Sequence, residues 1–294
     1  MATERFPRVS IGVPVYNGER YLRASLDALL AQTFTDIELI VSDNASTDAT
    51  WDICTEATLR DPRVRTFRQE RNLGAPANWN FTARQAHGRF FKWASASDLC
   101  APSMIERCLE AMQDESVVLA FGRTCLIEDD GRELGVFDRD FPVEDARPHE
   151  RFRRVCHQLS INNAQSGLIR MDALRRTRLD RLYPSGDLVL MAELAMQGKW
   201  RLIDEVLLYR RAGAQHFTAM RTSSELNEMF RPGAASELPF LNLRRHADFI
   251  GSALRSPAAP GERLRAAMAA LKGLYWDRRG VREDISRMLN RVRT

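Results

Sequence analysis

Short apolar runs alternate with amphipathic stretches over the first 115 residues of the chain. The expected strands are residues 9–15, 37–41, 64–67 and 90–93, and the expected helices are 19–32, the stretch between Ser46 and Pro62, 77–86 and 102–112. Short apolar runs are typical of buried strands, and apolar residues three and four positions apart are typical of helices that pack on one face. The alternation predicts a parallel α/β sheet flanked by helices.

The pattern changes after residue 115. Further strands are expected at 117–119, 124–127, 133–136, 166–169, 200–203 and 206–209, with a turn at Asp130-Gly131. Helices are expected at 151–159, 172–179 and 188–196, and beyond residue 220 the pattern is helical only, over 237–254, 262–274 and 282–292. We therefore expect one domain over residues 1–220, with halves at 1–115 and 116–220, followed by a helical extension over 221–294.

Polar residues follow three of the strands expected in the first half. They are Tyr16-Asn17, Asp43-Asn44 and the stretch from Ser95 to Asp98. Ligands of open α/β sheets bind beyond the carboxyl ends of the strands. These groups are therefore expected to meet in one crevice.

Composition and cysteine spacing exclude several classes of protein. No apolar run approaches the roughly 18 residues of a membrane span, and no signal-peptide pattern precedes the first strand. The five cysteines are scattered without a CxxC pair, which argues against a disulfide framework or a zinc site and favours the cytoplasm. We see no nucleic-acid-binding motif in the sequence.

The charge is concentrated in the last quarter of the chain. The net charge is +4, and residues 221–294 carry +6 while residues 1–220 carry −2. Two interpretations stay open: solvated helical faces, or a surface that meets anionic lipid or an acidic partner, as in a protein peripheral to the inner face of the membrane. A homodimer is also compatible with the sequence.

Several motifs occur in an order and spacing that resemble family 2 glycosyltransferases. They are Val13-Pro14-Val15-Tyr16-Asn17, Ala31-Gln32-Thr33-Phe34, the stretch from Glu38 to Asp48, Asn72-Leu73-Gly74 and the stretch from Ala86 to Trp93. The resemblance covers roughly residues 8–218. It implies the GT-A fold, a Rossmann-like, mostly parallel sheet, and an inverting transfer of a sugar from a nucleotide-diphospho-sugar.

The resemblance also implies a nucleotide site. Tyr16 would lie against the base and Asp43 would hydrogen-bond to it, with backbone or polar contacts from neighbouring residues. The implied nucleotide-binding set is Pro14, Val15, Tyr16, Asn17, Asp43, Asn44, Arg71, Lys92 and Ser97. UDP- or dTDP-sugars are the expected donors.

The expected metal motif departs from the family pattern. Family members carry a DxD-type motif that holds Mg²⁺ or Mn²⁺ on the diphosphate, whereas this chain has Ser95 and Ser97 at both Asp positions, followed by Asp98. Asp98 could hold a metal ion together with His216, because hard cations prefer carboxylate oxygens. Alternatively cations could replace the metal, with Arg71, Lys92, Arg210 and Arg211 as candidates. A third interpretation is an impaired enzyme.

A general base must remove the proton of the acceptor hydroxyl in an inverting transfer. By resemblance to the family's late acidic motif, Asp187 in Ser185-Gly186-Asp187 is the candidate base, although Asp is also a common helix N-cap. The segment from Asn162 to Gln165 is a candidate lining of the acceptor pocket.

The acceptor is not encoded in a recognisable motif. A glycan, a lipid-linked glycan and a secondary metabolite fit the family, and a peptide Ser, Thr or Cys is an alternative acceptor. A nucleotide-sugar-binding scaffold without turnover is a rival from another class, motivated by Ser95 and Ser97. A nucleotidyltransferase is disfavoured because no Gly-rich GxGxR-type start follows the first strand.

Overall fold

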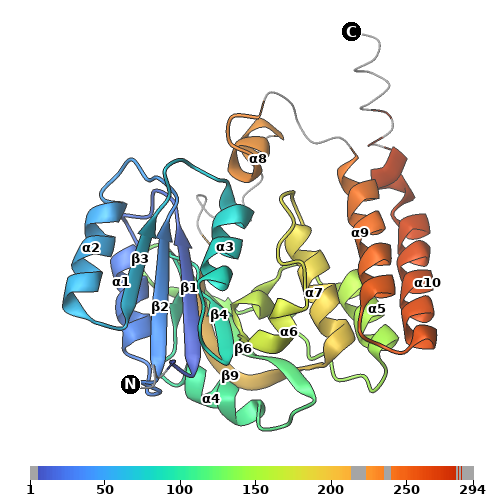
Figure 1. Ribbon diagram of the computed structural model, residues 1–294, viewed down its shortest axis with the longest axis horizontal. Helices are drawn as coiled ribbons and strands as arrows, with labels where there is room; N and C mark the ends of the chain where they lie inside the picture. The colour runs from blue at the N-terminus through green and yellow to red at the C-terminus, as the bar shows by residue number, and fades with distance from the viewer. Residues whose placement is uncertain (1–5, 213–222, 235–239, 283, 285, 287–294) are drawn as a thin grey trace, which may run out of the picture.

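We describe a computed structural model of the chain over residues 6–212, 223–234, 240–282, 284 and 286 (Figure 1). A curled sheet runs through the middle of the molecule, and its strand order is β3-β2-β1-β4-β8-β6-β9-β5, with β7 on β6. In the described part of the chain, no helix is both long and apolar enough to cross a membrane.

The first half of the sheet is parallel, as the alternating pattern predicts. Its strands are β1 (Val9–Val15), β2 (Ile37–Asp43), β3 (Val64–Arg68) and β4 (Phe90–Trp93). β1 lies between β2 and β4, and its last residue Val15 is level with Asp43 at the end of β2. The carboxyl ends of these strands therefore share one edge of the sheet.

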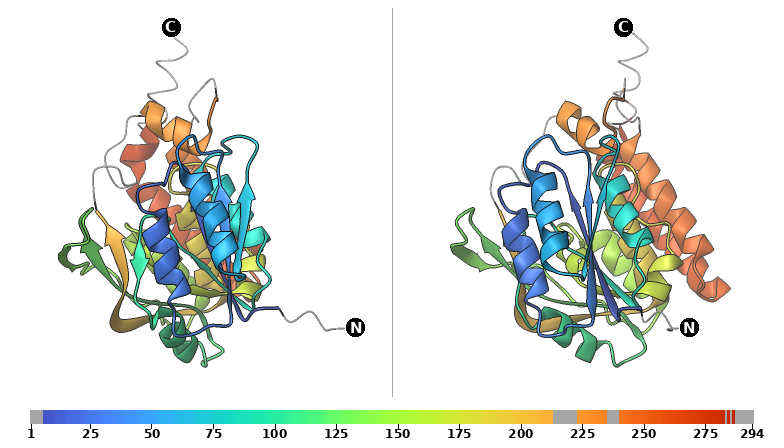
Figure 2. Two further views of the ribbon diagram at one scale, coloured as in Figure 1. Left: turned by 90° about the vertical axis from the view of Figure 1, so that its left-hand side faces the viewer. Right: turned by 60° about the vertical axis from the view of Figure 1, so that its left-hand side comes forward.

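Helices cover both faces of the sheet (Figure 2). The buried apolar side chains form two clusters. One cluster contains side chains of α1 (Leu22–Leu30), α2 (Thr50–Arg60) and α4 (Met104–Ala111). The other contains side chains of α3 (Ala75–Arg84), α5 (Pro148–Gln158), α6 (Met171–Arg175) and α7 (Gly186–Gln197). The sheet is thus buried on both faces, which explains its continuous apolar strands.

The second half of the sheet is mixed and has two long strands. β6 (Val117–Ile127) and β9 (Lys199–Arg211) pair in parallel, and β8 (Leu168–Arg170) pairs antiparallel with both β4 and β6. The short strand β5 (Leu99–Cys100) pairs with β9, and β7 (Glu133–Val136) pairs with β6. A 3₁₀ turn, η1 (Asn163–Ser166), precedes β8.

Some expected boundaries are wrong in this half. Residues 117–119 and 124–127 belong to one strand, and so do 200–203 and 206–209, because register shifts near Gly122 and Arg123 let β6 and β9 continue past their polar residues. The helix expected over 172–179 ends at Arg175, and Leu179 has a positive φ of 58°.

The C-terminal helices pack on the second cluster. α9 (Leu241–Arg255) and α10 (Pro260–Trp276) lie side by side at the end of the molecule opposite α2, and Phe249, Ala253 and Ala266 are buried in that cluster (Figure 1). α8 (Ser223–Phe230) is separate and lies near α3. The helix expected over 282–292 falls mostly outside the described residues.

Candidate functional site

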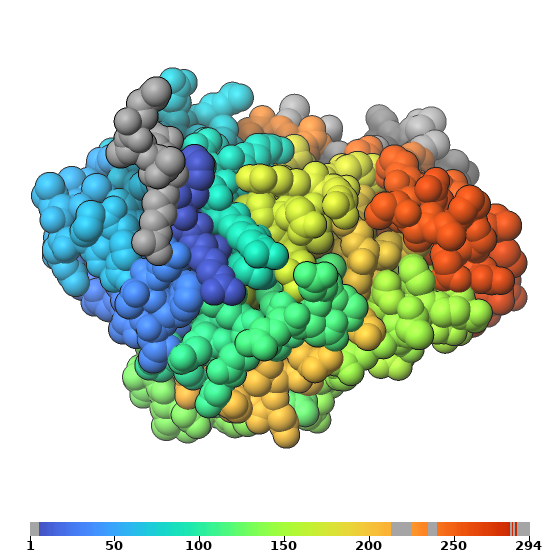
Figure 3. Space-filling view, turned by 60° about the horizontal axis from the view of Figure 1, so that its bottom comes forward, coloured from blue at the N-terminus to red at the C-terminus, as the bar shows by residue number. Residues whose placement is uncertain are grey.

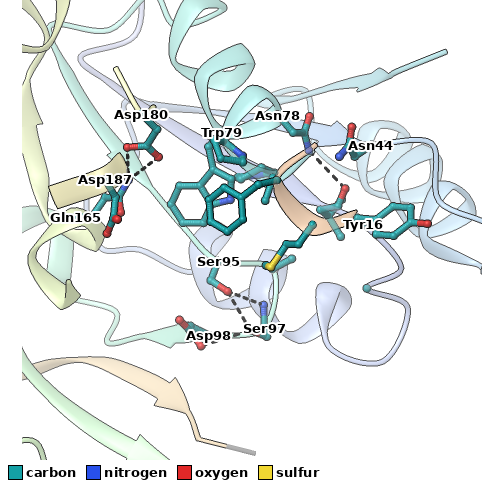
Figure 4. A pocket seen from close by; sticks show the side chains of 18 of the residues that line it. Tyr16, Asn44, Asn78, Trp79, Ser95, Ser97, Asp98, Gln165, Asp180 and Asp187 are labelled. Atoms are coloured by element: carbon teal, nitrogen blue, oxygen red, sulfur yellow. Dashed lines mark hydrogen bonds between the residues drawn. The ribbon is translucent and has the colours of Figure 1, made fainter. Parts of the chain in front are cut away.

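The carboxyl ends of β1, β2 and β4 open into a cavity of about 950 Å³ that reaches the first turn of α7 (Figure 4). The lining includes polar residues from all three expected strand ends, namely Tyr16, Asn17, Asn44 and the stretch from Ser95 to Asp98. The far side includes Asp180 and Asp187. Of the residues expected to meet in one crevice, all but Asp43 line this cavity. The cavity is large enough for a small molecule, since such sites span about 300–1,000 Å³.

The end of the cavity at β1 and β2 is lined by an exposed aromatic ring and by asparagine side chains that hydrogen bonds hold in place. Tyr16 is 48% exposed, so its ring is available to a ligand. Asn44 donates from Nδ2 to Asn72 Oδ1 over 2.7 Å and accepts from the Leu73 backbone amide over 2.9 Å. Asn78 on α3 donates to the Ser42 carbonyl over 2.8 Å. These bonds hold the side-chain amides rigid, while Pro14, Val15 and Asn17 complete this end.

Three predicted nucleotide-binding residues are not part of the cavity lining. Asp43 is fully buried behind Asn44, where Oδ1 accepts from the Ser46 amide over 3.0 Å and Oδ2 lies 3.3 Å from Arg68 Nε. Lys92 is 1% exposed and its ammonium donates to the carbonyls of Trp93 and Ser166. Arg71 also lies outside the lining. Contacts of these residues with a ligand stay predictions, and the burial of Lys92 argues against a direct one.

The two serines at the expected metal positions bond to each other. Ser95 Oγ and Ser97 Oγ are 2.9 Å apart, and Ser97 Oγ lies 3.5 Å from Asp98 Oδ1. Asp98 Oδ1 also accepts the backbone amide of Arg211 over 3.1 Å, because β5 pairs with the end of β9. The cluster thus joins the end of β4 to the end of β9.

These residues do not fit a divalent cation by themselves. Asp98 supplies one carboxylate, hydroxyls are weaker ligands for hard cations, and the described residues contain no group of three or more His, Cys, Asp or Glu that could hold a metal ion. His216 lies outside the described residues. Metal binding by Asp98 and His216 therefore stays a prediction.

The two predicted phosphate-binding arginines both line the cavity but are held differently. Arg210 Nη1 donates to Asn163 Oδ1 over 2.6 Å, a neutral partner that leaves its positive charge uncompensated by that bond. Arg211 donates from Nη1 to the carbonyls of Glu128 and Asp129 over 3.0 Å each, and its guanidinium lies over the Tyr21 ring at 4.6 Å. Arg210 is thus the better placed of the two for an anion.

Asp187 lies in the first turn of α7, at the far side of the cavity from Tyr16. Its Oδ2 accepts from Asn162 Nδ2 over 2.9 Å. Desolvation raises the pKa of Asp187, while the Asn162 hydrogen bond and the charge of Arg210 oppose that rise. A carboxylate with a raised pKa at a cavity wall is a strong candidate for proton transfer.

Asp180 was missed by the sequence analysis. Burial and, to a smaller extent, the charge of Asp187 raise the pKa of this carboxyl to about 8, although hydrogen bonds from Gln165 oppose the rise. Gln165 Nε2 reaches both carboxylate oxygens of Asp180, at 3.2 and 3.0 Å. Of the segment expected to line the acceptor side, Asn162 and Gln165 do line the cavity.

The sequence analysis also did not predict one wall of the cavity. α8 contributes Glu225, Glu228, Met229 and Phe230 to the lining. The Phe230 carbonyl lies so close to Gly74 that a Cβ there would come within 2.6 Å of it. Gly74 of the Asn72-Leu73-Gly74 motif therefore also contacts the end of α8.

Comparison with known proteins identifies the family to which the chain belongs. A family model described as "Glycosyl transferase family 2" matches residues 10–177. Glycosyltransferase GlyG of Streptococcus pneumoniae is 27% identical over 228 residues, which are 74% of this chain and 75% of GlyG.

Solved structures show the same fold. S. aureus TarS 1–349 has a TM-score of 0.64 at 16% identity, covering 91% of this chain and 72% of that chain, and TarS has also been solved in complex with UDP-GlcNAc. Mannosyltransferase PcManGT from Pyrobaculum calidifontis, in complex with GDP-Man and Mn²⁺, has a TM-score of 0.55 at 15% identity, covering 98% of this chain and 76% of that chain. With a GT-A fold and a family match over more than half its length, the chain belongs to glycosyl transferase family 2 and is a glycosyltransferase.

Proposed function

We propose that the cavity binds a nucleotide-diphospho-sugar and that Asp187 activates an acceptor hydroxyl for an inverting transfer. The observation that carries this proposal is the placement of Asp187 on the same cavity as the strand-end residues Tyr16, Asn44 and Ser97. The nucleotide lies against Tyr16, with the pyrophosphate toward the Ser95–Asp98 stretch. The acceptor enters from the Asn162 side.

The proposed reaction needs one group that accepts the proton, Asp187, and one leaving group, the nucleoside diphosphate. The Asp187 carboxylate takes the proton of the acceptor hydroxyl as its oxygen attacks the anomeric carbon from the face opposite the diphosphate. The new glycosidic bond forms as the bond from the anomeric carbon to the diphosphate oxygen breaks. The nucleoside diphosphate leaves, and the configuration at the anomeric carbon inverts.

Arg210 is our candidate for stabilising the leaving diphosphate. Its guanidinium lines the cavity beside Asn163, and an arginine donates two parallel hydrogen bonds to phosphate oxygens. Arg211 has a supporting role, because its guanidinium is bonded to two loop carbonyls. A divalent cation, Mn²⁺ or Mg²⁺, held by Asp98 and His216 would add to this stabilisation and is a further proposal.

Solved structures of similar proteins narrow the choice of donor to nucleotide-sugars, whereas several classes of acceptor remain candidates. From the family resemblance we propose a UDP- or dTDP-sugar as the donor. TarS, solved with UDP-GlcNAc, supports UDP, and PcManGT, solved with GDP-Man, is the reason to test GDP-sugars as well. Our acceptor candidates are a glycan, a lipid-linked glycan or a secondary metabolite, with a peptide as the alternative. Cytoplasmic location, homodimer formation and contact of residues 221–294 with a membrane or protein are further proposals.

A second candidate function is donor binding without turnover. The serine pair at the expected metal positions favours it, because serine hydroxyls hold poorly the divalent cation that would compensate a departing diphosphate. This protein would bind a nucleotide-sugar as tightly as an enzyme does and would release no nucleoside diphosphate.

Replacement of Asp187 by Asn separates these functions. We expect Asp187→Asn to bind the donor nucleotide normally and to lower release of nucleoside diphosphate from the donor at least ~10²-fold, the scale of acid–base catalysis. A matched control is Asp172→Asn, an exposed carboxylate on α6 that lies 3.7 Å from Arg176. Unchanged turnover in Asp187→Asn would remove Asp187 as the base, and no turnover in the wild-type protein would favour the second function.

A further inference from the structure

An apolar stripe runs along the outer face of α10. Leu264, Met268, Leu271 and Tyr275 are 59, 51, 51 and 66% exposed. They are spaced four, three and four residues apart, so they lie on one side of the helix. The opposite side is filled by the buried alanines Ala266, Ala267, Ala269 and Ala270. Large side chains thus face solvent where small ones face the core, the reverse of an ordinary surface helix.

Cations flank this stripe. Helical spacing places Arg265 and Lys272 along one side of it, and both are exposed. Arg279, which is also exposed, follows the end of α10 at Trp276. Arg278 also follows the end of α10, and its guanidinium lies over the Tyr275 ring at 5.3 Å. Positive charge therefore lies beside the stripe and past its C-terminal end.

One acidic residue in the first turn of α10 and one directly after its end have basic partners on neighbouring residues. Glu262 accepts hydrogen bonds from the His149 backbone amide and from Arg265 Nη1, and the Glu262–His149 contact ties α10 to α5. Asp277 accepts from Arg245 and lies 3.0 Å from His246 Nε2, both on α9. Glu262 thus compensates the charge of Arg265, and the net positive charge beside the stripe comes from Lys272, Arg278 and Arg279.

We propose that this outer face of α10 docks on a bilayer surface that contains anionic phospholipids. Interfacial helices bury an apolar stripe about 5–10 Å into the headgroup region and hold anionic headgroups with flanking Lys and Arg. Charge complementarity selects this occupant over a second copy of the chain, because a symmetric pair would bring the same cations together. α10 lies at the orange-red end of the molecule, remote from α2 and the other blue elements, so docking leaves those elements free (Figures 1 and 3).

Vesicle binding tests this proposal independently of sugar transfer. We expect the full-length protein to sediment with vesicles of phosphatidylglycerol and phosphatidylcholine and to stay in solution with phosphatidylcholine alone. Raised salt should weaken binding, because the flanking charges are screened. Equal binding to both vesicles, or none to either, would overturn the proposal.

Paired substitutions distinguish the stripe from general basicity. Leu264→Ser with Leu271→Ser should reduce the bound fraction at least ~10-fold, whereas Leu59→Ser, at an 84% exposed leucine on α2, should leave it unchanged. Lys272→Glu with Arg279→Glu should reduce it as well, and circular dichroism checks that each variant is folded. Undiminished binding by both double variants would overturn the proposal, as would light scattering that shows the stripe to form a dimer instead. Failure of glycosyl transfer would leave this result untouched.

Discussion

The carboxyl group of Asp187 is subject to opposing influences on its pKa. Desolvation at the start of α7 raises the pKa, and the hydrogen bond from Asn162 together with the charge of Arg210 lowers it. A base must be ionised to accept a proton. The transfer rate is therefore expected to rise with pH as Asp187 loses its proton, at a pH above the ordinary range of an aspartate.

Removal of the Asn162 amide should shift this rise. Asn162→Ala removes the 2.9 Å hydrogen bond that stabilises ionised Asp187, so the pKa of Asp187 should increase further. We expect the acid limb of the kcat/KM profile to move to higher pH, with full activity recovered at alkaline pH. The measurement is donor turnover between pH 4 and 9, and an unmoved acid limb would contradict the assignment of Asp187 as the titrating base.

The strand-end residues could be predicted from the sequence and Asp180 could not. Parallel strands end at one edge of a sheet, so Tyr16, Asn44 and Ser97 converge once the strands are recognised. Asp180 is placed by contacts distant in sequence: its backbone amide donates to Asn80 Oδ1 over 3.0 Å, and Asn80 returns a bond to its carbonyl. No local pattern encodes a loop that is held by a helix 100 residues earlier.

The strands and helices, like the site residues, could be predicted only where a local pattern determines them. β1 to β4 follow from apolar runs between helices, whereas β6 and β9 look interrupted because Gly122, Asp204 and Glu205 resemble turn residues. Their long pairing tolerates these residues through register shifts. The extension over 221–294 is recognisable as helical, but its packing on α5 and α7 depends on small residues that no periodicity identifies.

The packing of α5 against α9 predicts that the extension unfolds with the rest of the chain. Phe152 on α5 is fully buried, and its ring meets Phe249 of α9 edge-on at 6.2 Å. Phe152→Ala should lower the free energy of unfolding by about 3–5 kcal/mol, because it leaves a cavity in the shared core. Urea denaturation followed by circular dichroism and tryptophan fluorescence provides the measurement.

The control for that variant is Leu59→Ala, whose side chain is 84% exposed and should change stability by no more than about 0.5 kcal/mol. Coincident transitions by the two probes are expected. Two separate transitions, or a loss equal to that of the control, would contradict a core shared by α5 and the extension.

The molecule as a whole combines a sheet edge, where we propose that the donor binds, with a wall built from η1, α7 and the loop before it, where we propose that the acceptor binds. The cavity spans both, and the end of β9 joins them through the contact of Arg211 with Asp98. The outer face of α10 lies apart from this cavity, so surface attachment and sugar transfer can be tested separately.

Calorimetric titration of the wild-type protein with UDP, dTDP and GDP, each in EDTA and in Mn²⁺, tests the proposed donor site most directly. We predict that at least one nucleotide binds with one-to-one stoichiometry and that Tyr16→Ala weakens its affinity about 10-fold, since stacking of a base on an aromatic ring contributes about 1–3 kcal/mol. A difference between EDTA and Mn²⁺ would show the contribution of a metal ion. Absence of binding by all three nucleotides in both conditions would contradict a nucleotide-sugar site in this cavity.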